Sequence, residues 1–255
     1  MIWQIFTTMN QAYYEAIGHE MIQSWLHHWP KDQCLTVYVE GTVDLPPDSR
    51  LVTRDWHAAC QPWFDRFCET RGGSEIKFAK KGLVWCDWLF DHSADKLLWL
   101  DADVLSLKPM TMTMLDHYLG EHLGAVFDNS PSTDLLTVES GVVMLNPRHK
   151  KYHSFRGQYR SYYHHVKMPE KATRFYDGEV LGNSILPFGD HVKIMNADLG
   201  KAYGNPLKRV PLGQYLRHFK GRSKHHHDNL AQHWRDGADL NYNPLLVGAE
   251  SRQND

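Results

Sequence analysis

Short apolar runs alternate with segments of helical periodicity along the first hundred residues of the chain. Residues 2–8 form a β-type run, and from Asn10 apolar positions recur at helical spacing until Pro30. Residues 96–100 (KLLWL) read as a strand buried on both faces, and this run ends abruptly at Asp101. The other elements predicted here are strands over 35–40 and 51–53 and a helix over about 75–91.

After residue 103 the alternation is less regular. The predicted strands cover 123–127, 141–145, 192–195 and 215–219, and the predicted helices cover about 149–165 and 178–186. From Asp228 onward the chain is polar and weakly patterned, which is typical of a partly ordered tail. The pattern therefore predicts an α/β fold with a mixed central sheet.

Composition narrows the function classes. The chain has 255 residues, of which 42% are hydrophobic, so it can close a sizeable core and is not a disordered chain. Lys and Arg number 28 against 30 Asp and Glu, so no basic footprint for nucleic acid stands out. The four cysteines include no C-x-x-C pair and are expected to be reduced thiols. No signal peptide and no membrane span is recognisable, and we expect a cytoplasmic protein.

Two acids, Asp101 and Asp103, stand directly after the apolar run 96–100. In an extended segment residues i and i+2 share a face, so both carboxylates can converge on one hard divalent cation, which prefers oxygen ligands. Two unpaired charges at the end of a buried strand would be costly without a counter-ion. A metal site is therefore predicted here, and a turn or a helix cap is the alternative.

A second group of candidate residues is HFKGRSK, residues 218–224. His218 offers a nitrogen ligand to a metal such as Mn²⁺, Gly221 permits close approach of an anion to the backbone, and Lys224 can neutralise a phosphate. A metal ligand, an accessible backbone and a positive charge are the groups that bind a diphosphate together with its metal ion. The alternative is a surface histidine beside a solvated basic patch.

Together the two motifs resemble the glycogenin-like, metal-dependent glycosyltransferases of the GT-A fold (glycosyltransferase family 8 type), which combine a strand-borne D-x-D with a late H-x-x-G-x-x-K. Also similar to segments of that family are TTMNQAYY (7–14), ESGVVMLN (139–146) and FYDGEVLG (175–182). The resemblance implies transfer of a sugar from a nucleotide-sugar donor, with UDP-sugars foremost, to a sugar, lipid or protein acceptor. It also implies a Mn²⁺ or Mg²⁺ cofactor and retention of configuration at the anomeric carbon.

Carried over residue by residue, the resemblance implies a metal held by Asp101, Asp103 and His218. It places the donor against Thr8, Asn10, Tyr13, Ala102, Gly221 and Lys224, the last two at its phosphates. A basic residue on the helix before the D-x-D strand would reach the diphosphate, and Lys80 or Lys81 could serve, although a solvated helix face is an equal alternative. The resemblance covers residues 1–224 as one GT-A domain, in which 1–103 would form the nucleotide-binding half and 104–224 the acceptor half, and it leaves a polar C-terminal tail over 225–255.

The sequence departs from the family pattern at two positions near the expected reaction centre. Gly178 stands where the family has the Gln of D-Q-D, and Glu139 stands where it has the Asn of N-x-G. The carboxylates left to position an acceptor or face the anomeric carbon are Asp177, Glu139 and Glu179, and a structural role is the alternative for each. These departures keep open a non-catalytic relative that only binds nucleotide sugars. A metal-dependent phosphohydrolase is less supported, because residues 2–10 contain no acid.

Overall fold

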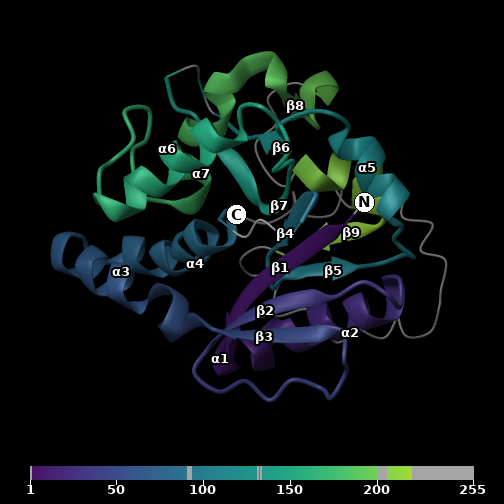
Figure 1. Cartoon of the computed structure of the whole chain (residues 1–255). Helices are drawn as coiled ribbons and strands as arrows, with labels where there is room; N and C mark the ends of the chain where they lie inside the picture. The colour runs from purple at the N-terminus through teal and green to yellow at the C-terminus, as the bar shows by residue number, and fades with distance from the viewer. Residues whose placement is uncertain (1, 91–93, 131, 133, 200–205, 220–255) are drawn as a thin grey trace, which may run out of the picture.

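The computed structural model describes residues 2–90, 94–130, 132, 134–199 and 206–219. A seven-stranded sheet crosses the molecule in the order β3-β2-β1-β4-β7-β6-β8 (Figure 1). Six strands run parallel and β7 alone runs against its neighbours, so the sheet is mixed, as predicted. Its strands are β1 (Trp3–Asn10), β2 (Leu35–Glu40), β3 (Leu51–Asp55), β4 (Lys96–Leu100), β6 (Gly124–Asp128), β7 (Val138–Leu145) and β8 (Val192–Ile194).

Helices cover both faces of this sheet (Figure 1). One face carries α3 (Trp56–Thr70), α4 (Ser74–Trp88), α6 (Tyr152–His164) and α7 (Asp177–Ile185). The other carries α2 (His19–His28), α5 (Met112–Leu119) and the short 3-10 turns η4 (Pro206–Arg209) and η5 (Pro211–Gln214). The remaining short elements are α1 (Gln11–Tyr13), the π-helical turn η1 (Tyr14–Gly18), η2 (Leu186–His191) and η3 (Ala197–Leu199).

Strand β4 shows why the sheet is buried on both sides. Leu97 and Trp99 pack into the core under α4 and α6, and Leu98 and Leu100 pack into the core under α2 and α5. All four side chains are fully buried. Burying one leucine stabilises a fold by roughly 1.5–3 kcal/mol, so this run anchors the centre of the sheet. The polar residues that follow it are thereby held at a fixed edge.

A second, two-stranded sheet brings the end of the described chain to that edge. Strand β5 (Val104–Ser106) pairs with β9 (Leu216–His218), and Val104 lies opposite His218. The backbone N–H of Phe219 donates to the carbonyl oxygen of Asp103 at 2.9 Å. This pairing sets the two sequence motifs side by side.

The strands over 35–40 and 96–100 are confirmed to the residue, and the other predicted elements are present with shifted ends. The single helix expected between Asn10 and Pro30 is divided by the π-helical turn η1. Helices α3 and α5 and strand β5 were not predicted. In α3 only Trp56, Cys60 and Phe67 are buried, so its apolar stripe is too sparse to be recognised.

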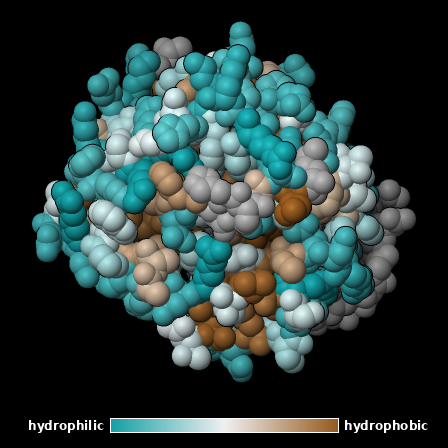
Figure 2. All heavy atoms as spheres, in the orientation of Figure 1, coloured by the Kyte–Doolittle hydropathy of each residue, from teal (hydrophilic) through white to brown (hydrophobic). Residues whose placement is uncertain are grey.

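Gly221, Lys224 and the predicted tail over 225–255 lie outside the described residues. Within the described part, no helix has the length and apolar character needed to cross a membrane. The face seen in Figure 1 is largely hydrophilic, and apolar surface gathers in its lower half, where β2 and β3 lie (Figure 2). Val52 of β3 is 44% exposed.

Candidate functional site

The candidate site lies where β4 ends and the reversed strand β7 begins. Asp101 and Asp103 follow β4, and His218 closes β9. One ligand atom from each of these three residues lies within 4.8 Å of the others. The carboxyl ends of parallel strands are where open α/β sheets place their ligands, so the position and the chemistry of the cluster agree.

The two acids meet through a turn. The N–H of Val104 donates to the carbonyl oxygen of Asp101 at 2.9 Å, so residues 101–104 turn back on themselves. The prediction that an extended i, i+2 spacing aligns the carboxylates is therefore wrong in mechanism, although the carboxylates do converge. Ala102 between them is 4% exposed and packs its methyl group into the core, so this side chain does not face the cluster.

His218 is held between carboxylates on both sides of its ring. Its Nε2 lies 3.0 Å from Asp103 Oδ1 and 3.8 Å from Asp101 Oδ2, and its Nδ1 lies 3.1 Å from Glu139 Oε1. Burial lowers the pKa of His218, but the hydrogen bonds to Asp103 and Glu139 outweigh burial and raise that pKa to about 9. The site is thus strongly attractive to positive charge.

Lys81 of α4 supplies a second cation. Its Nζ lies 2.5 Å from Asp101 Oδ1 and 2.8 Å from Asp177 Oδ2, and it also donates to the hydroxyl of Ser140 at 3.0 Å. Burial alone lowers the pKa of Lys81, yet the two carboxylates raise it well above its usual value. Burial raises the pKa of Asp177, whereas Lys81 and Ser140 bring it below its usual value. Lys81 and Asp177 are therefore both charged at neutral pH.

The residues expected near the nucleoside stand at the same edge. Tyr13 donates its hydroxyl hydrogen to Asp103 Oδ2 at 2.9 Å, so it contacts the acid pair directly. Asn10 caps α1 by accepting the N–H of Tyr13 at 2.8 Å. The hydroxyl of Thr8 donates to the carbonyl oxygen of Tyr38 on the neighbouring strand at 3.0 Å. These bonds fix the end of β1 beside the cluster.

Two predicted site residues point elsewhere. Lys80 pairs with Glu40, and its Nζ lies 5.7 Å from the ring centre of Trp56. Of these two lysines, Lys81 is the one that pairs with the acid cluster. Glu179 accepts the N–H of Thr173 at 2.5 Å, so its carboxylate closes the loop before α7.

Gly178 occupies a position without room for a side chain. A Cβ atom there would lie 2.6 Å from the carbonyl oxygen of Val138. Helix α7 therefore packs directly on the backbone of β7, and the amide of the family's Gln has no space in this chain. The neighbouring Asp177 is the polar group that this helix presents to Lys81 and Ser140.

Sequence reasoning did not single out Trp99 and Ser140. The indole N–H of Trp99 donates to Asp101 Oδ1 at 2.7 Å, and the hydroxyl of Ser140 donates to Asp177 Oδ2 at 2.6 Å. The i, i+2 spacing of Trp99 and Asp101 is a signal for the first contact. Ser140 lies within a segment already similar to the family, but its partner on α7 is distant in sequence.

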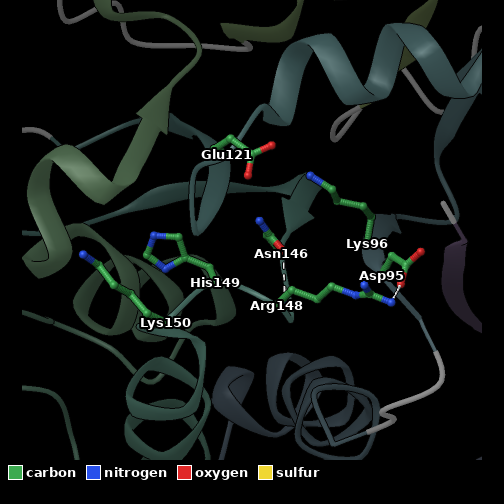
Figure 3. Close-up of a pocket in the computed structure, with 7 residues that line it drawn as sticks. All are labelled: Asp95, Lys96, Glu121, Asn146, Arg148, His149 and Lys150. Atoms are coloured by element: carbon green, nitrogen blue, oxygen red, sulfur yellow. Dashed lines mark hydrogen bonds and ion pairs between the residues drawn. The ribbon is translucent and has the colours of Figure 1, made fainter.

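A separate cavity of about 600 Å³ lies at the opposite end of β4 (Figure 3). Its walls carry charges of both signs and come from Asp95, Lys96, Glu121, Asn146, Arg148, His149 and Lys150. Arg148 pairs there with Asp95, and Lys96 donates to the carbonyl oxygen of Gly120 at 2.8 Å. The cavity shares no lining residue with the acid cluster.

The sequence matches no protein family and no curated protein. Its fold is similar to the galactosyltransferase LgtC, crystallised with donor and acceptor sugar analogs, with 17% identity over 91% of this chain and 94% of that chain and a TM-score of 0.53. It is also similar to mouse xyloside xylosyltransferase 1, with 10% identity over 75% of this chain and 84% of that chain and a TM-score of 0.51. It is similar as well to the bifunctional glycosyltransferase WbbM, with 14% identity over 87% of this chain and 46% of that chain and a TM-score of 0.56. The chain has the GT-A fold, as the resemblance implied.

Proposed function

We propose that this protein is a metal-dependent glycosyltransferase that moves a sugar from a nucleotide-sugar donor to an acceptor hydroxyl. The observation that carries the proposal is the convergence of Asp101, Asp103 and His218 at the carboxyl edge of a GT-A sheet. UDP-sugars are the first donors to test. The acceptor is a sugar, lipid or protein hydroxyl. Residues 1–103 form the nucleotide-binding half and 104–224 the acceptor half.

The donor set of the cluster fits Mn²⁺ or Mg²⁺. Two carboxylates and one imidazole offer oxygen and nitrogen ligands, a mixture that suits Mn²⁺ well. Asp103 and His218 are 4% and 5% exposed, whereas the side chain of Asp101 is 21% exposed, so solvent and ligands reach the cluster from that side. A bound ion would act as a Lewis acid that takes up negative charge on the leaving nucleoside diphosphate.

The chain's own residues prepare this site. Tyr13 orients Asp103 through its hydroxyl group, and Trp99 orients Asp101 through its indole N–H. Lys81 adds a fixed positive charge beside Asp101, where charge on a leaving diphosphate develops. Gly221 and Lys224, which lie outside the described residues, are the further residues that we propose for contacts to the phosphates. Thr8 and Asn10 border the nucleoside.

Asp177 is the carboxylate that we assign to the reaction centre. Lys81 and Ser140 keep it ionised, and it stands beside the metal ligand Asp101 through their shared partner Lys81. Glu179 is committed to the loop at Thr173. An ionised carboxylate near the anomeric carbon stabilises positive charge in the transition state, and we assign the reaction a retaining outcome.

A nucleotide-sugar-binding protein without turnover is the second candidate. It is favoured by one observation, the absence of space for any side chain at Gly178. Both candidates bind donor and metal alike. Only the enzyme releases nucleoside diphosphate at a rate that depends on the acidic cluster.

The test incubates the protein with Mn²⁺, a panel of UDP- and other nucleotide-sugars and a panel of acceptors, and measures nucleoside diphosphate release and the anomeric configuration of the product. The Asp101→Asn, Asp103→Asn double variant should lose all turnover. Asp65→Asn on α3 is the matched control, because among the described residues its carboxylate accepts a hydrogen bond from Gln61 on the same helix. Tight donor binding without release or transfer supports the binding protein, and release of inorganic phosphate contradicts both candidates.

A further inference from the structure

We propose that Glu139 is a positioning residue that orients the imidazole of His218 so that Nε2 faces the acid pair. The inference rests on the proposed metal-binding role of Asp101, Asp103 and His218. It gives Glu139 a task that differs from the catalytic one expected from the sequence.

The ring of His218 is fixed from two opposite sides. Nδ1 lies 3.1 Å from Glu139 Oε1, and Nε2 lies 3.0 Å from Asp103 Oδ1. Glu139 and His218 are 4% and 5% exposed. Because solvent does not reach this pair, neither side chain gains alternative water partners by turning away, and the contact is retained.

Glu139 is itself held in place. Its Oε1 accepts the N–H of Gly141 at 3.2 Å, and β7 is paired on both sides by β4 and β6. Neighbouring side chains of a strand point to opposite faces. Glu139 therefore turns toward His218 on β9, while Ser140 turns toward Lys81 and Asp177.

Gly141 makes room for the imidazole. A Cβ atom on Gly141 would lie 2.4 Å from both Nδ1 and Cε1 of His218. The ring is thus seated against the bare backbone of β7, with Nδ1 3.1 Å from a carboxylate oxygen of Glu139. The two features, a slot without a side chain and a buried acid at its wall, define one orientation of the ring.

This orientation has a chemical consequence for metal binding. A histidine ligand commonly donates its second ring N–H to a carboxylate, which fixes the tautomer and raises the basicity of the ligating nitrogen. For His218 the proposal places the N–H on Nδ1, 3.1 Å from Glu139 Oε1, so the lone pair for a bound ion would be on Nε2, toward Asp101 and Asp103. The Asn of the family pattern offers a neutral oxygen in place of this charge, so the Glu is a functional departure.

The experiment measures Mn²⁺ affinity by electron paramagnetic resonance of the free ion at one fixed pH. Loss of such an acceptor typically weakens metal binding about 10–100-fold, which is the effect expected for Glu139→Gln. Circular dichroism and thermal unfolding verify that the variant is folded. The half-saturating Mn²⁺ concentration for turnover should rise by the same factor while kcat at saturating Mn²⁺ recovers, which a purely structural defect would not produce.

Two further variants frame the result. Gly141→Ala pushes the ring out of its slot and should also weaken Mn²⁺ binding. Glu121→Gln, an exposed residue near the far end of β4, is the matched control and should leave Mn²⁺ affinity unchanged. If a variant fails to fold, ¹⁵N spectra of the Zn²⁺-loaded parent with labelled histidine decide the matter. The account expects a protonated Nδ1 and a metal-bound Nε2 for His218, and the reverse overturns it.

The outcomes separate this inference from the proposed function. If the parent binds Mn²⁺ and folded Glu139→Gln binds it equally well, the positioning role is wrong and the metal site stands. If the parent does not bind Mn²⁺ at all, the proposed metal-dependent function fails.

Discussion

The Nζ atom of Lys81 lies 2.5 Å from Oδ1 of Asp101, so the first acid of the D-x-D motif has a cationic partner without any metal ion. The same nitrogen lies 2.8 Å from Asp177. One lysine therefore connects the proposed metal ligand with the proposed carboxylate of the reaction centre. Its charge offsets part of the repulsion between buried acids, and the cluster depends on it for stability.

Replacing Lys81 by Met should destabilise the fold, because two buried carboxylates lose their common partner. Removing one member of a buried ion pair costs about 3–5 kcal/mol. Urea unfolding of the metal-free protein measures the change. Lys77→Met, an exposed lysine on the same helix, is the control and should shift the unfolding free energy little. Equal stability of Lys81→Met and the parent would contradict the described network.

Replacing Asp177 by Asn should lower kcat while the dissociation constant of the donor stays nearly constant. Loss of a carboxylate that acts in the transition state typically costs about 10²–10⁴ in rate. Turnover kinetics and calorimetric donor binding measure the two quantities separately. Glu179→Gln should cost far less, because Glu179 bonds to the loop at Thr173. A larger loss in Glu179→Gln would move the catalytic assignment to that residue.

Gly178→Ala should destabilise the fold by about 1–3 kcal/mol, because its Cβ would lie 2.6 Å from the carbonyl oxygen of Val138 and α7 must shift. The comparison is Gly157→Ala in α6, where no heavy atom of the described residues lies within 4 Å of the new Cβ. That variant should be stabilised by about 0.5–1 kcal/mol, since alanine favours helix over glycine. Chemical unfolding of both variants measures the two changes in unfolding free energy. A Gly178→Ala variant as stable as the parent would contradict the close packing of α7 on β7.

Acid should destabilise the fold through His164 between pH 6.5 and 4. Burial, reinforced by Arg160, lowers the pKa of His164 to about 4, and its Nε2 accepts the N–H of Arg160 at 3.0 Å. Because the folded pKa lies below the ordinary value of about 6.5, the stability from the neutral ring is present above pH 6.5 and is lost as pH falls toward 4.

The test for this effect is His164→Phe, which retains an aromatic ring to stack on Trp63 at 3.7 Å but cannot titrate. Unfolding free energy measured from pH 7 to 4 should fall less steeply in this variant than in the parent. Parallel curves would exclude His164 as a source of the acid sensitivity.

The sequence predicted the centre of the fold and the three residues, Asp101, Asp103 and His218, that the fold brings together as a candidate metal site. The run 96–100 is recognisable because burial on both faces leaves four consecutive apolar residues after Lys96, and the two motifs were expected to act together. Their contact depends on the pairing of β5 with β9, and β5 has only three residues, too few to show a pattern. The D-x-D geometry was predicted for the wrong reason, since a turn, not an extended segment, aligns the acids.

Other features of the site depend on distances that a sequence does not contain. Lys80 and Lys81 are adjacent lysines, so the sequence alone does not separate their roles. The orientation of α4 about its own axis directs Lys81 to Asp177 and Lys80 to Glu40. Likewise, the sequence shows at Gly178 only the absence of the family's Gln. The structure shows that the glycine permits a close contact between helix α7 and strand β7. The partner of Glu139 is on β9, distant in sequence, so its contact with His218 was not predicted.

Calorimetric titration of UDP, with and without Mn²⁺, into the parent and into Asp101→Asn, Asp103→Asn tests the central claim most directly. The account predicts that UDP binds the parent only when Mn²⁺ is present, because the acids Asp101 and Asp103 repel a free diphosphate and attract one that carries an ion. The folded double variant should lose that metal dependence together with most of the affinity. If the double variant binds UDP as tightly as the parent, with the same response to Mn²⁺, the metal site is not at these residues.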